Sequence, residues 1–177
     1  MADSSITKKA LANSFKCLMA EVPFAKINIA DICEKCQMNR KSFYYHFRDK
    51  YELLNWIFDT ESIEAIKKSN CQNISEVFDT LFSYFYENRS FYKKALQIDG
   101  QNSFSEHFRE LCKPIFTEVL QNSNYDKQTT EFHVNFIADA LMCAIIRWLT
   151  SPHCMEPEKF ASLLKSSLRI IDNFKVE

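Results

Sequence analysis

Glycine is almost absent from this sequence, and proline is scarce. A single glycine, Gly100, and four prolines are spread over 177 residues. Tight hairpin turns and glycine-rich phosphate loops therefore have almost nothing to be built from. Hydrophobic residues, at 46%, are numerous enough for a sizeable core. The composition predicts an all-α protein.

The sequence also lacks a signal peptide at its start and a long uninterrupted hydrophobic run. The most apolar stretch, 136–149, contains Asp139 and Arg147 and is too short to cross a bilayer as a helix. Seven cysteines suggest a disulfide framework at first, but their odd number favours free thiols in a reducing cytosol. We expect a cytoplasmic protein without a membrane span.

Charge is distributed unevenly along the chain. Residues 1–50 hold nine Lys and Arg against five Asp and Glu, whereas residues 51–177 hold thirteen against eighteen. A net charge of +4 at one end of an otherwise acidic chain suggests that this end meets a polyanion. A chance distribution of surface charge is the alternative.

Apolar residues at three- and four-residue spacing predict about nine helices. Their expected ranges are 4–20, 29–36, 40–47, 49–69, 75–88, 90–97, 103–120 (bent or restarted at Pro114), 128–150 and 156–174. Asn28 with Asp31, then Asn39, then Asp49 are expected to cap the second, third and fourth helices. We expect a small bundle over 1–48 and a larger one over 49–177.

The segment 27–50 has the layout of a helix-turn-helix, with a supporting helix, a short turn and a second short helix. Phe43 and Phe47, four residues apart, are expected to face the core. The side chains left outside are basic, hydroxylated or aromatic, and can donate to guanine edges or phosphates: Arg40, Lys41, Ser42, Tyr44, Tyr45 and His46. The alternative is a solvated basic turn between two core helices.

Two stretches carry a family resemblance. FYYHFRDKYELL at 43–54, preceded by IADI at 29–32, resembles the DNA-binding signature of the TetR family of one-component regulators. The resemblance implies a three-helix DNA-binding domain, followed by a helical domain that dimerises and often holds a small-molecule pocket. It also implies DNA contacts from Asn28, Arg40, Lys41, Ser42, Tyr44, His46 and Lys50, with Tyr45 adjacent. The expected partner is a pseudo-palindromic duplex bound by a homodimer.

Gln37 and Lys50 are unusual residues for their positions near this motif. The family commonly has glycine in the turn where this chain has Gln37, so a left-handed residue there costs more than glycine would. Lys50 begins a helix, where a cation is unfavourable against the helix dipole unless an anion lies nearby. We therefore expect a phosphate beside Lys50; a surface pair with Asp49 or Glu52 is the alternative.

A second, shorter resemblance lies in the C-terminal part. ALQIDGQNSF at 95–104, together with YELLNWIF at 51–58, resembles the TetR branch that includes regulators of dihydroxyacetone kinase genes. That branch includes coactivators that work through a partner protein. Two functions follow: a repressor gated by a small molecule, or a coactivator whose C-terminal domain docks a protein.

Other reactive residues do not form a recognisable catalytic or metal site. Cys33 and Cys36 form a C-x-x-C without the second ligand pair that zinc needs, and His107, His133 and His153 are scattered. We therefore predict no enzyme activity, no cofactor and no metal. Asp139, Cys143 and Arg147 share one helical face, for which we expect an ion pair within or between chains, with ligand binding as the alternative.

The last two expected helices, 128–150 and 156–174, have apolar faces wider than one small core requires. Two copies are therefore expected to associate through these helices as a four-helix interface. The residues expected to form it are Phe136, Ile137, Leu141, Ile145, Trp148, Phe160, Leu163, Leu164, Leu168 and Ile171.

Overall fold

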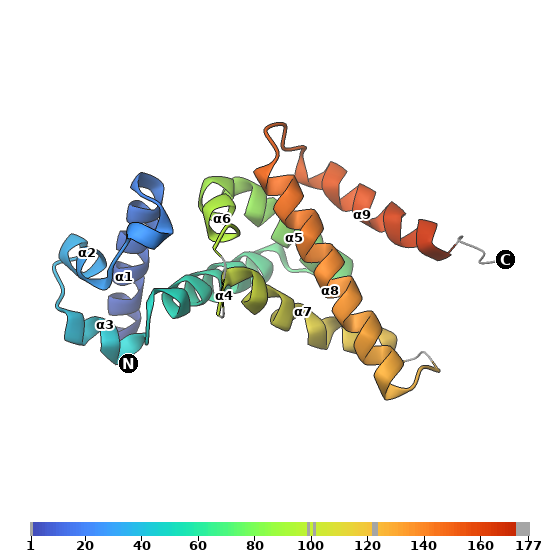
Figure 1. The fold of residues 1–177 in the computed structure, drawn as a ribbon, viewed down its shortest axis with the longest axis horizontal. Coiled ribbons are helices and arrows are strands. Elements are labelled where there is room, and N and C mark those ends of the chain that lie inside the picture. The colour runs from blue at the N-terminus through green and yellow to red at the C-terminus, as the bar shows by residue number, and fades with distance from the viewer. Residues whose placement is uncertain (1, 99, 101, 122–123, 173–177) are drawn as a thin grey trace.

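The computed structural model describes residues 2–98, 100, 102–121 and 124–172, and within them the chain is all-α (Figure 1). The helices are α1 (Ala2–Glu21), α2 (Ile29–Lys35), α3 (Arg40–His46), α4 (Lys50–Ser69), α5 (Ile74–Glu87), α6 (Arg89–Ala95), α7 (Phe104–Leu120), α8 (Lys127–Thr150) and α9 (Pro157–Asp172). A short 3-10 helix, η1 (Phe24–Lys26), joins α1 to α2. The predicted fold class is confirmed, and α7 continues through Pro114. Phe174, the expected end of the last helix, lies outside the described residues.

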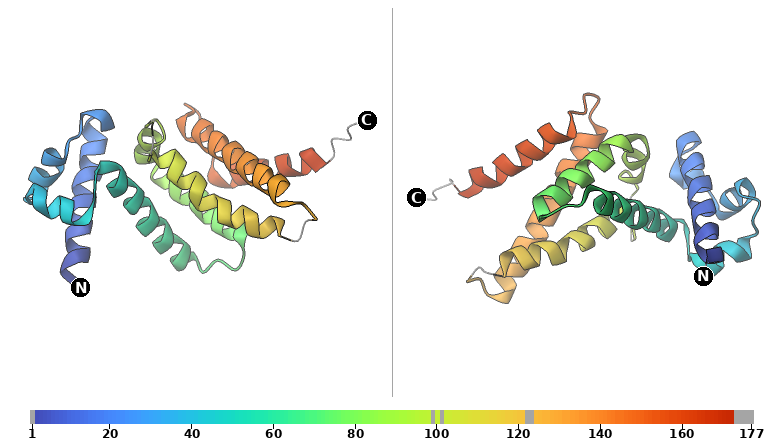
Figure 2. Two further views of the ribbon diagram at one scale, coloured as in Figure 1. Left: turned by 60° about the horizontal axis from the view of Figure 1, so that its bottom comes forward. Right: turned by 180° about the vertical axis from the view of Figure 1, so that it is seen from behind.

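The helices form two groups joined by one long helix. Helices α1, α2 and α3 gather at one end of the molecule, and α4 leads from them into the larger group of α5 to α9 (Figures 1 and 2). Helix α1 packs on α4, and Phe47, the residue after α3, meets Trp56 of α4 with ring centroids 5.7 Å apart. Helices α5 and α7 contact the same helix. The N-terminal group therefore rests on a helix that also belongs to the core of the larger group.

Side-chain caps fix where the first short helices begin. Asn28 and Asp31 form a reciprocal capping box at α2, with N···O distances of 2.9 and 3.1 Å. Asn39 accepts from the backbone N–H of Ser42 at the start of α3, and Asp49 caps α4. The three caps predicted from the sequence are confirmed, and they explain why two helices of seven residues each have defined ends.

The turn between α2 and α3 contains a strained residue. Gln37 has a φ of 56°, in the left-handed region that favours glycine. The N–H of Met38 donates to the carbonyl of Cys33 at 2.8 Å and closes the turn. The turn is therefore formed with glutamine where the family commonly has glycine.

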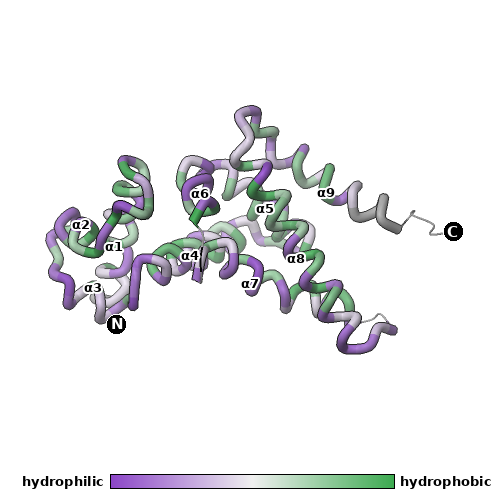
Figure 3. Tube along the Cα trace, in the orientation of Figure 1, coloured by the Kyte–Doolittle hydropathy of each residue, from purple (hydrophilic) through white to green (hydrophobic). Residues whose placement is uncertain are grey.

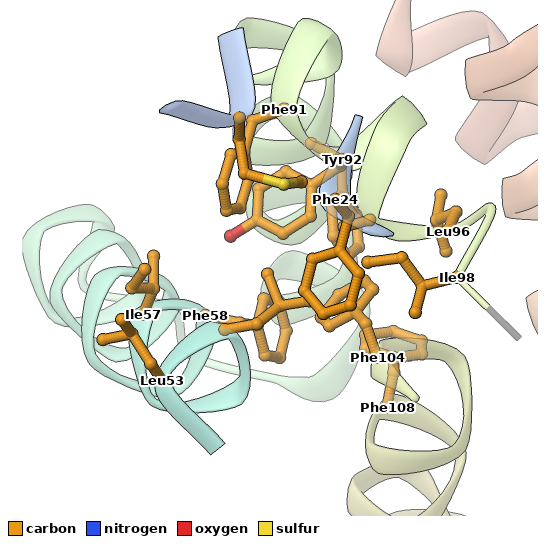
Figure 4. Packing of buried hydrophobic residues seen from close by; sticks show 14 of the residues in the cluster. Phe24, Leu53, Ile57, Phe58, Phe91, Tyr92, Leu96, Ile98, Phe104 and Phe108 are labelled. Carbon is orange, nitrogen blue, oxygen red and sulfur yellow. The ribbon is translucent and has the colours of Figure 1, made fainter. Parts of the chain in front are cut away.

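Aromatic rings fill the interior of the larger group. Phe58 of α4 stacks on Phe85 of α5, with centroids 5.6 Å apart, and meets Phe104 and Phe108 of α7 edge to face. Tyr92 of α6 is fully buried beside them (Figure 4). Such offset and edge-on arrangements add to the free energy gained by burying the rings, so α4 to α7 share one rigid core.

Helix α8 is apolar on more than one side. By length and composition it is the one helix in the described part of the chain that could span a membrane, and 33% of its apolar window is buried. Figure 3 shows hydrophobic residues along α5 and α8, in contrast to the more hydrophilic segment before α3. The inner side of α8 packs on α6 and α7. The opposite side of α8 is left for solvent or a partner.

The structure corrects part of the expected dimer surface. Ile145, Trp148 and Phe160 are buried within their own chain, because α8 packs on the core and Trp148 stacks on Phe160 at 4.1 Å. Ile137, Leu141 and Leu164 are half-buried, and the side chains of Leu168 and Ile171 lie outside the described set. Among the side chains of α8 and α9 whose burial is described, the large apolar ones left exposed are Phe132, Phe136 and Leu163.

Candidate nucleic-acid interface

Helix α3 presents one polar face and anchors the other in the core. Phe43 and Phe47 are 0% and 3% exposed and lie in ring contact with each other. On the opposite face Tyr44 is 57% and Tyr45 82% exposed. Arg40 and Lys41 are exposed on the first turn, while Ser42 and His46 are half-buried. The sequence-based assignment of faces is confirmed for the two buried phenylalanines and for four of the six outer residues, while Ser42 and His46 are only partly exposed.

The first turn of α3 is well suited to donate to an anion. Asn39 accepts from both the backbone N–H and the hydroxyl of Ser42, at 2.8 and 3.1 Å. Arg40 and Lys41 are the first two residues of the helix, at the end where its dipole is positive. This end therefore combines fixed donors with two cationic side chains.

Asn28 lies at the start of the supporting helix α2, exposed, with its side-chain oxygen committed to the capping box. The amide nitrogen of its side chain takes no part in that box. An N–H donor at a helix N-terminus is a common phosphate contact in protein–DNA complexes.

Lys50 is placed differently from a free surface lysine. Its Nζ donates to the carbonyl oxygens of Phe24 at 2.8 Å and Ile27 at 2.7 Å, and lies 4.2 Å from the centre of the Phe24 ring. Partial burial lowers the pKa of Lys50. The alternative, a surface pair with Asp49 or Glu52, does not form: Asp49 caps α4, and Glu52 binds Arg48. Of the three ammonium hydrogens, one remains for a further acceptor.

One basic residue of this end was not singled out by the sequence. Lys8 of α1 holds its Nζ 5.6 Å from the centre of the Phe47 ring and 5.7 Å from that of Trp56. It therefore stands beside the C-terminal end of α3. Only the general charge asymmetry pointed to it, because no spacing rule distinguishes Lys8 from its neighbour Lys9.

The cysteine pair at the end of α2 and His107 have structural surroundings. Cys33 is buried, its thiol pKa is raised by burial, and the Cys36 thiol donates to the carbonyl of Ile32. His107 pairs with Asp59 at 2.7 Å. Within the described ranges no three His, Cys, Asp or Glu side chains are grouped to hold a metal ion.

The polar face of α8 is partly explained by an ion pair. Asp139 lies 2.9 Å from Nε of Arg109 on α7, so its partner is in the same chain but is not Arg147. Cys143 is exposed, and so is Arg147. The expected ion pair is thus present for Asp139.

The arrangement defines a helix-turn-helix regulator: a supporting helix, a closed turn and a second helix with a basic, exposed face. Two family profiles match the chain, "Bacterial regulatory proteins, tetR family" over residues 16–57 and "Transcriptional regulator C-terminal region" over residues 72–169. The chain therefore belongs to the TetR family of DNA-binding transcriptional regulators, a family of regulators and not of enzymes.

Individual relatives agree with this assignment. The "HTH-type dhaKLM operon transcriptional activator DhaS" of Lactococcus lactis is 31% identical over 153 residues, which are 83% of this chain and 81% of that protein. A TetR regulator from Streptococcus agalactiae, 20% identical, superposes with a TM-score of 0.71 over 96% of both chains. NalD of Pseudomonas aeruginosa, 18% identical, gives 0.59 over 96% of this chain and 97% of its own. The two solved structures share the fold.

Proposed function

We propose that this regulator binds a pseudo-palindromic operator as a homodimer, with one α3 in the major groove of each half-site. The exposed basic face of α3 carries the proposal, because Phe43 and Phe47 hold the helix from behind while Arg40, Lys41, Tyr44 and Tyr45 stay exposed. A major groove admits one helix, and a two-fold dimer presents two of them one helical turn of DNA apart.

Roles for the individual side chains follow from their positions. Arg40 and Lys41 donate to guanine edges or to phosphates, and the Tyr44 hydroxyl and His46 reach phosphates nearby. The Ser42 hydroxyl donates to a phosphate by turning its one proton away from Asn39 Oδ1. Tyr45 adds an exposed ring at the same face. Asn28 and Lys50 donate to phosphates on the flanks, Lys50 with its remaining N–H.

We place the domain boundary at the start of α4, with the DNA-binding domain over 1–48 and the dimerisation and effector domain over 49–177. The exposed apolar side chains of α8 and α9 form the contact between copies. Phe132 and Phe136 of α8 stack on each other in the open, and Leu163 of α9 is 43% exposed. Unpartnered aromatic rings of this kind are typical of subunit interfaces. Such a regulator works in the cytoplasm, where the DNA is.

The main function proposed is repression relieved by a small molecule. A groove of about 730 Å³ between α5 and α9, crossed by the Lys165–Asp79 ion pair, falls in the size range of small-molecule sites. Because α5 packs on α4 and α4 carries the DNA-binding domain, a ligand there could favour one arrangement of the two domains.

Activation with a protein partner is the second candidate. The relative from Lactococcus lactis is named as an operon activator, and in such a case the C-terminal domain would dock a second protein.

Selection from random duplex DNA with the purified full-length protein, followed by gel shift, tests the proposal. Recovery of an inverted repeat bound with nanomolar Kd by the protein alone is the expected result. Transcription in vitro from a promoter carrying that repeat then separates the candidates, since a repressor lowers the transcript yield. Recovery of no common sequence would contradict specific DNA binding.

A further inference from the structure

A chain of polar groups runs from the DNA-binding domain into the interior of the larger domain. Nζ of Lys16 on α1 lies 2.8 and 2.9 Å from the two carboxylate oxygens of Glu61 on α4. The hydroxyl of Tyr84 on α5 donates to the same carboxylate at 2.7 Å, and the Tyr92 hydroxyl of α6 lies 2.7 Å from that of Tyr84. Four helices therefore meet through four side chains.

The inner end of this chain is buried among aromatic rings. Tyr92 is 0% and Tyr84 8% exposed, and burial raises the pKa of Tyr92, which keeps it a neutral phenol. A buried hydroxyl is costly unless it is hydrogen-bonded. Because Tyr84 gives its one proton to Glu61, Tyr92 must donate to Tyr84. Each hydroxyl thus donates its proton outwards, from Tyr92 in the core to Tyr84 and from Tyr84 to the carboxylate that binds Lys16.

The same part of α1 is held by two further contacts from α6. Nζ of Lys94 lies 2.6 Å from the carbonyl oxygen of Met19 and 2.9 Å from that of Ala20, and so caps the C-terminal end of α1. Phe91 meets Phe15 edge to face. Among these contacts the Lys16 to Glu61 pair is the one in which both partners are charged, and it fixes α1 against α4, the helix that both domains share.

We propose that Glu61 is a positioning residue for operator binding: together with Lys16 and Tyr84 it sets the angle between the two domains of each protomer, and so the spacing of half-sites that the dimer accepts. The proposal rests on the dimeric operator binding proposed above. In a two-fold dimer the distance between the two recognition helices depends on how each DNA-binding domain sits on its own C-terminal domain. If the angle between the two domains is less fixed, the dimer therefore binds operators with a wider range of half-site spacings.

This role differs from a contribution to stability. Lys16 and Glu61 are each about one-third exposed in their side chains, and such ion pairs add little to the free energy of unfolding. Their effect is expected on geometry instead. Discrimination between operator spacings reports on that geometry, whereas a merely structural pair would leave it unchanged.

The test uses the full-length protein and duplexes that carry the half-sites recovered by selection, separated by the selected spacer or by a spacer one base pair shorter or longer. We expect Glu61→Gln and Lys16→Met to lower the ratio of affinities between the selected and altered spacers by about fivefold or more. Affinity for a duplex with one half-site should stay within about twofold. The two variants change the net charge in opposite directions, so a shared effect on spacing cannot come from charge.

Matched controls come from an ion pair inside one helix. Nζ of Lys113 lies 2.6 Å from Glu110 on α7, so Lys113→Met and Glu110→Gln repeat the same charge changes without touching the domain junction. Both should keep the wild-type spacing ratio.

One outcome overturns the inference, and a separate outcome removes its basis. A wild-type spacing ratio in Glu61→Gln and Lys16→Met shows that the pair does not position the domains. If circular dichroism shows that either variant is unfolded, Tyr84→Phe, which removes one hydroxyl, is measured instead. A wild-type spacing ratio in Tyr84→Phe then overturns the inference. Failure of the wild-type protein to select an inverted repeat is a different result: it contradicts the dimeric operator binding and removes the basis of the inference.

Discussion

The ammonium group of Lys50 lies 2.7 Å from the carbonyl oxygen of Ile27, so the first residue of α4 holds the segment that leads into α2. The same group binds the carbonyl of Phe24. Lys50 therefore joins the supporting helix of the helix-turn-helix to the helix that enters the larger domain. A phosphate bound by the remaining N–H would connect this joint directly to DNA.

Lys50→Met should lower both stability and the salt dependence of DNA binding. Two carbonyl oxygens lose a charged donor, which we expect to lower the free energy of unfolding by about 1–2 kcal/mol. Loss of one phosphate contact per half-site should reduce the slope of log K against log salt by about one for each half-site. Urea unfolding and fluorescence anisotropy at four salt concentrations measure the two effects.

Lys41→Met is the control for this experiment, since Lys41 is exposed on α3. It should reduce the slope without lowering stability. A Lys50→Met protein that is less stable but keeps the wild-type slope would restrict Lys50 to its structural contacts.

Arg40→Ala and Lys41→Ala should each weaken operator binding while leaving the fold intact. A bidentate contact to guanine is worth about 1–3 kcal/mol, and its loss should relax specificity at one base position of each half-site. Lys159→Ala, which removes an exposed lysine of α9, is the matched control. Gel shift against single-base operator variants measures the effect. Unchanged operator affinity in both α3 variants would exclude α3 as the recognition helix.

The local structure of the DNA-binding domain could be predicted because its signals are local. Asn28, Asn39 and Asp49 cap the helices that directly follow them, and the spacing of Phe43 and Phe47 fixes the buried face of α3. Side-chain caps and helical periodicity act over three or four residues. Sequence patterns can therefore report them directly.

Contacts between distant segments could not be predicted in the same way. Glu61 binds Lys16 across 45 residues, yet no pattern distinguishes it from Glu64 on the same helix. The contacts of Lys50 depend on where the loop around Phe24 lies. On α8, apolar residues occur on two sides, and periodicity alone cannot tell the side that packs on α6 and α7 from the side left open. For this reason the sequence pattern places Ile145 and Trp148 in the interface between copies, whereas the structure buries both within their own chain.

Gln37→Gly should stabilise the protein. A left-handed conformation costs about 1–2 kcal/mol for a residue with a Cβ, while the greater freedom of glycine in the unfolded chain offsets about 0.5–1 kcal/mol. The net gain expected in urea unfolding, at fixed protein concentration, is about 0.5–1 kcal/mol. Asn70→Gly is the control: Asn70 has a φ of 51°, and asparagine tolerates this region better, so its gain should be smaller. Equal or opposite effects would contradict the assigned strain.

Cys143 is exposed on α8, between the exposed rings of Phe132 and Phe136 and the side chain of Arg147. If two copies associate through this side of α8, Cys143 should react slowly with iodoacetamide in the dimer and faster after dilution to monomer. Cys17, exposed on α1, should react quickly at every concentration. Cys112 should always react slowly, because burial raises its thiol pKa to about 12 and little thiolate is present at neutral pH.

Mass spectrometry of the labelled peptides gives the three rates in one sample, and sedimentation gives the oligomeric state. Phe136→Ser should shift the protein towards monomer and raise the rate at Cys143, since it removes an exposed ring from the proposed contact. Ile63→Ser, on an exposed part of α4, should change neither quantity. A sedimenting dimer in which Cys143 reacts as fast as Cys17 would place the interface elsewhere, and a monomer at micromolar concentration would contradict the dimer itself.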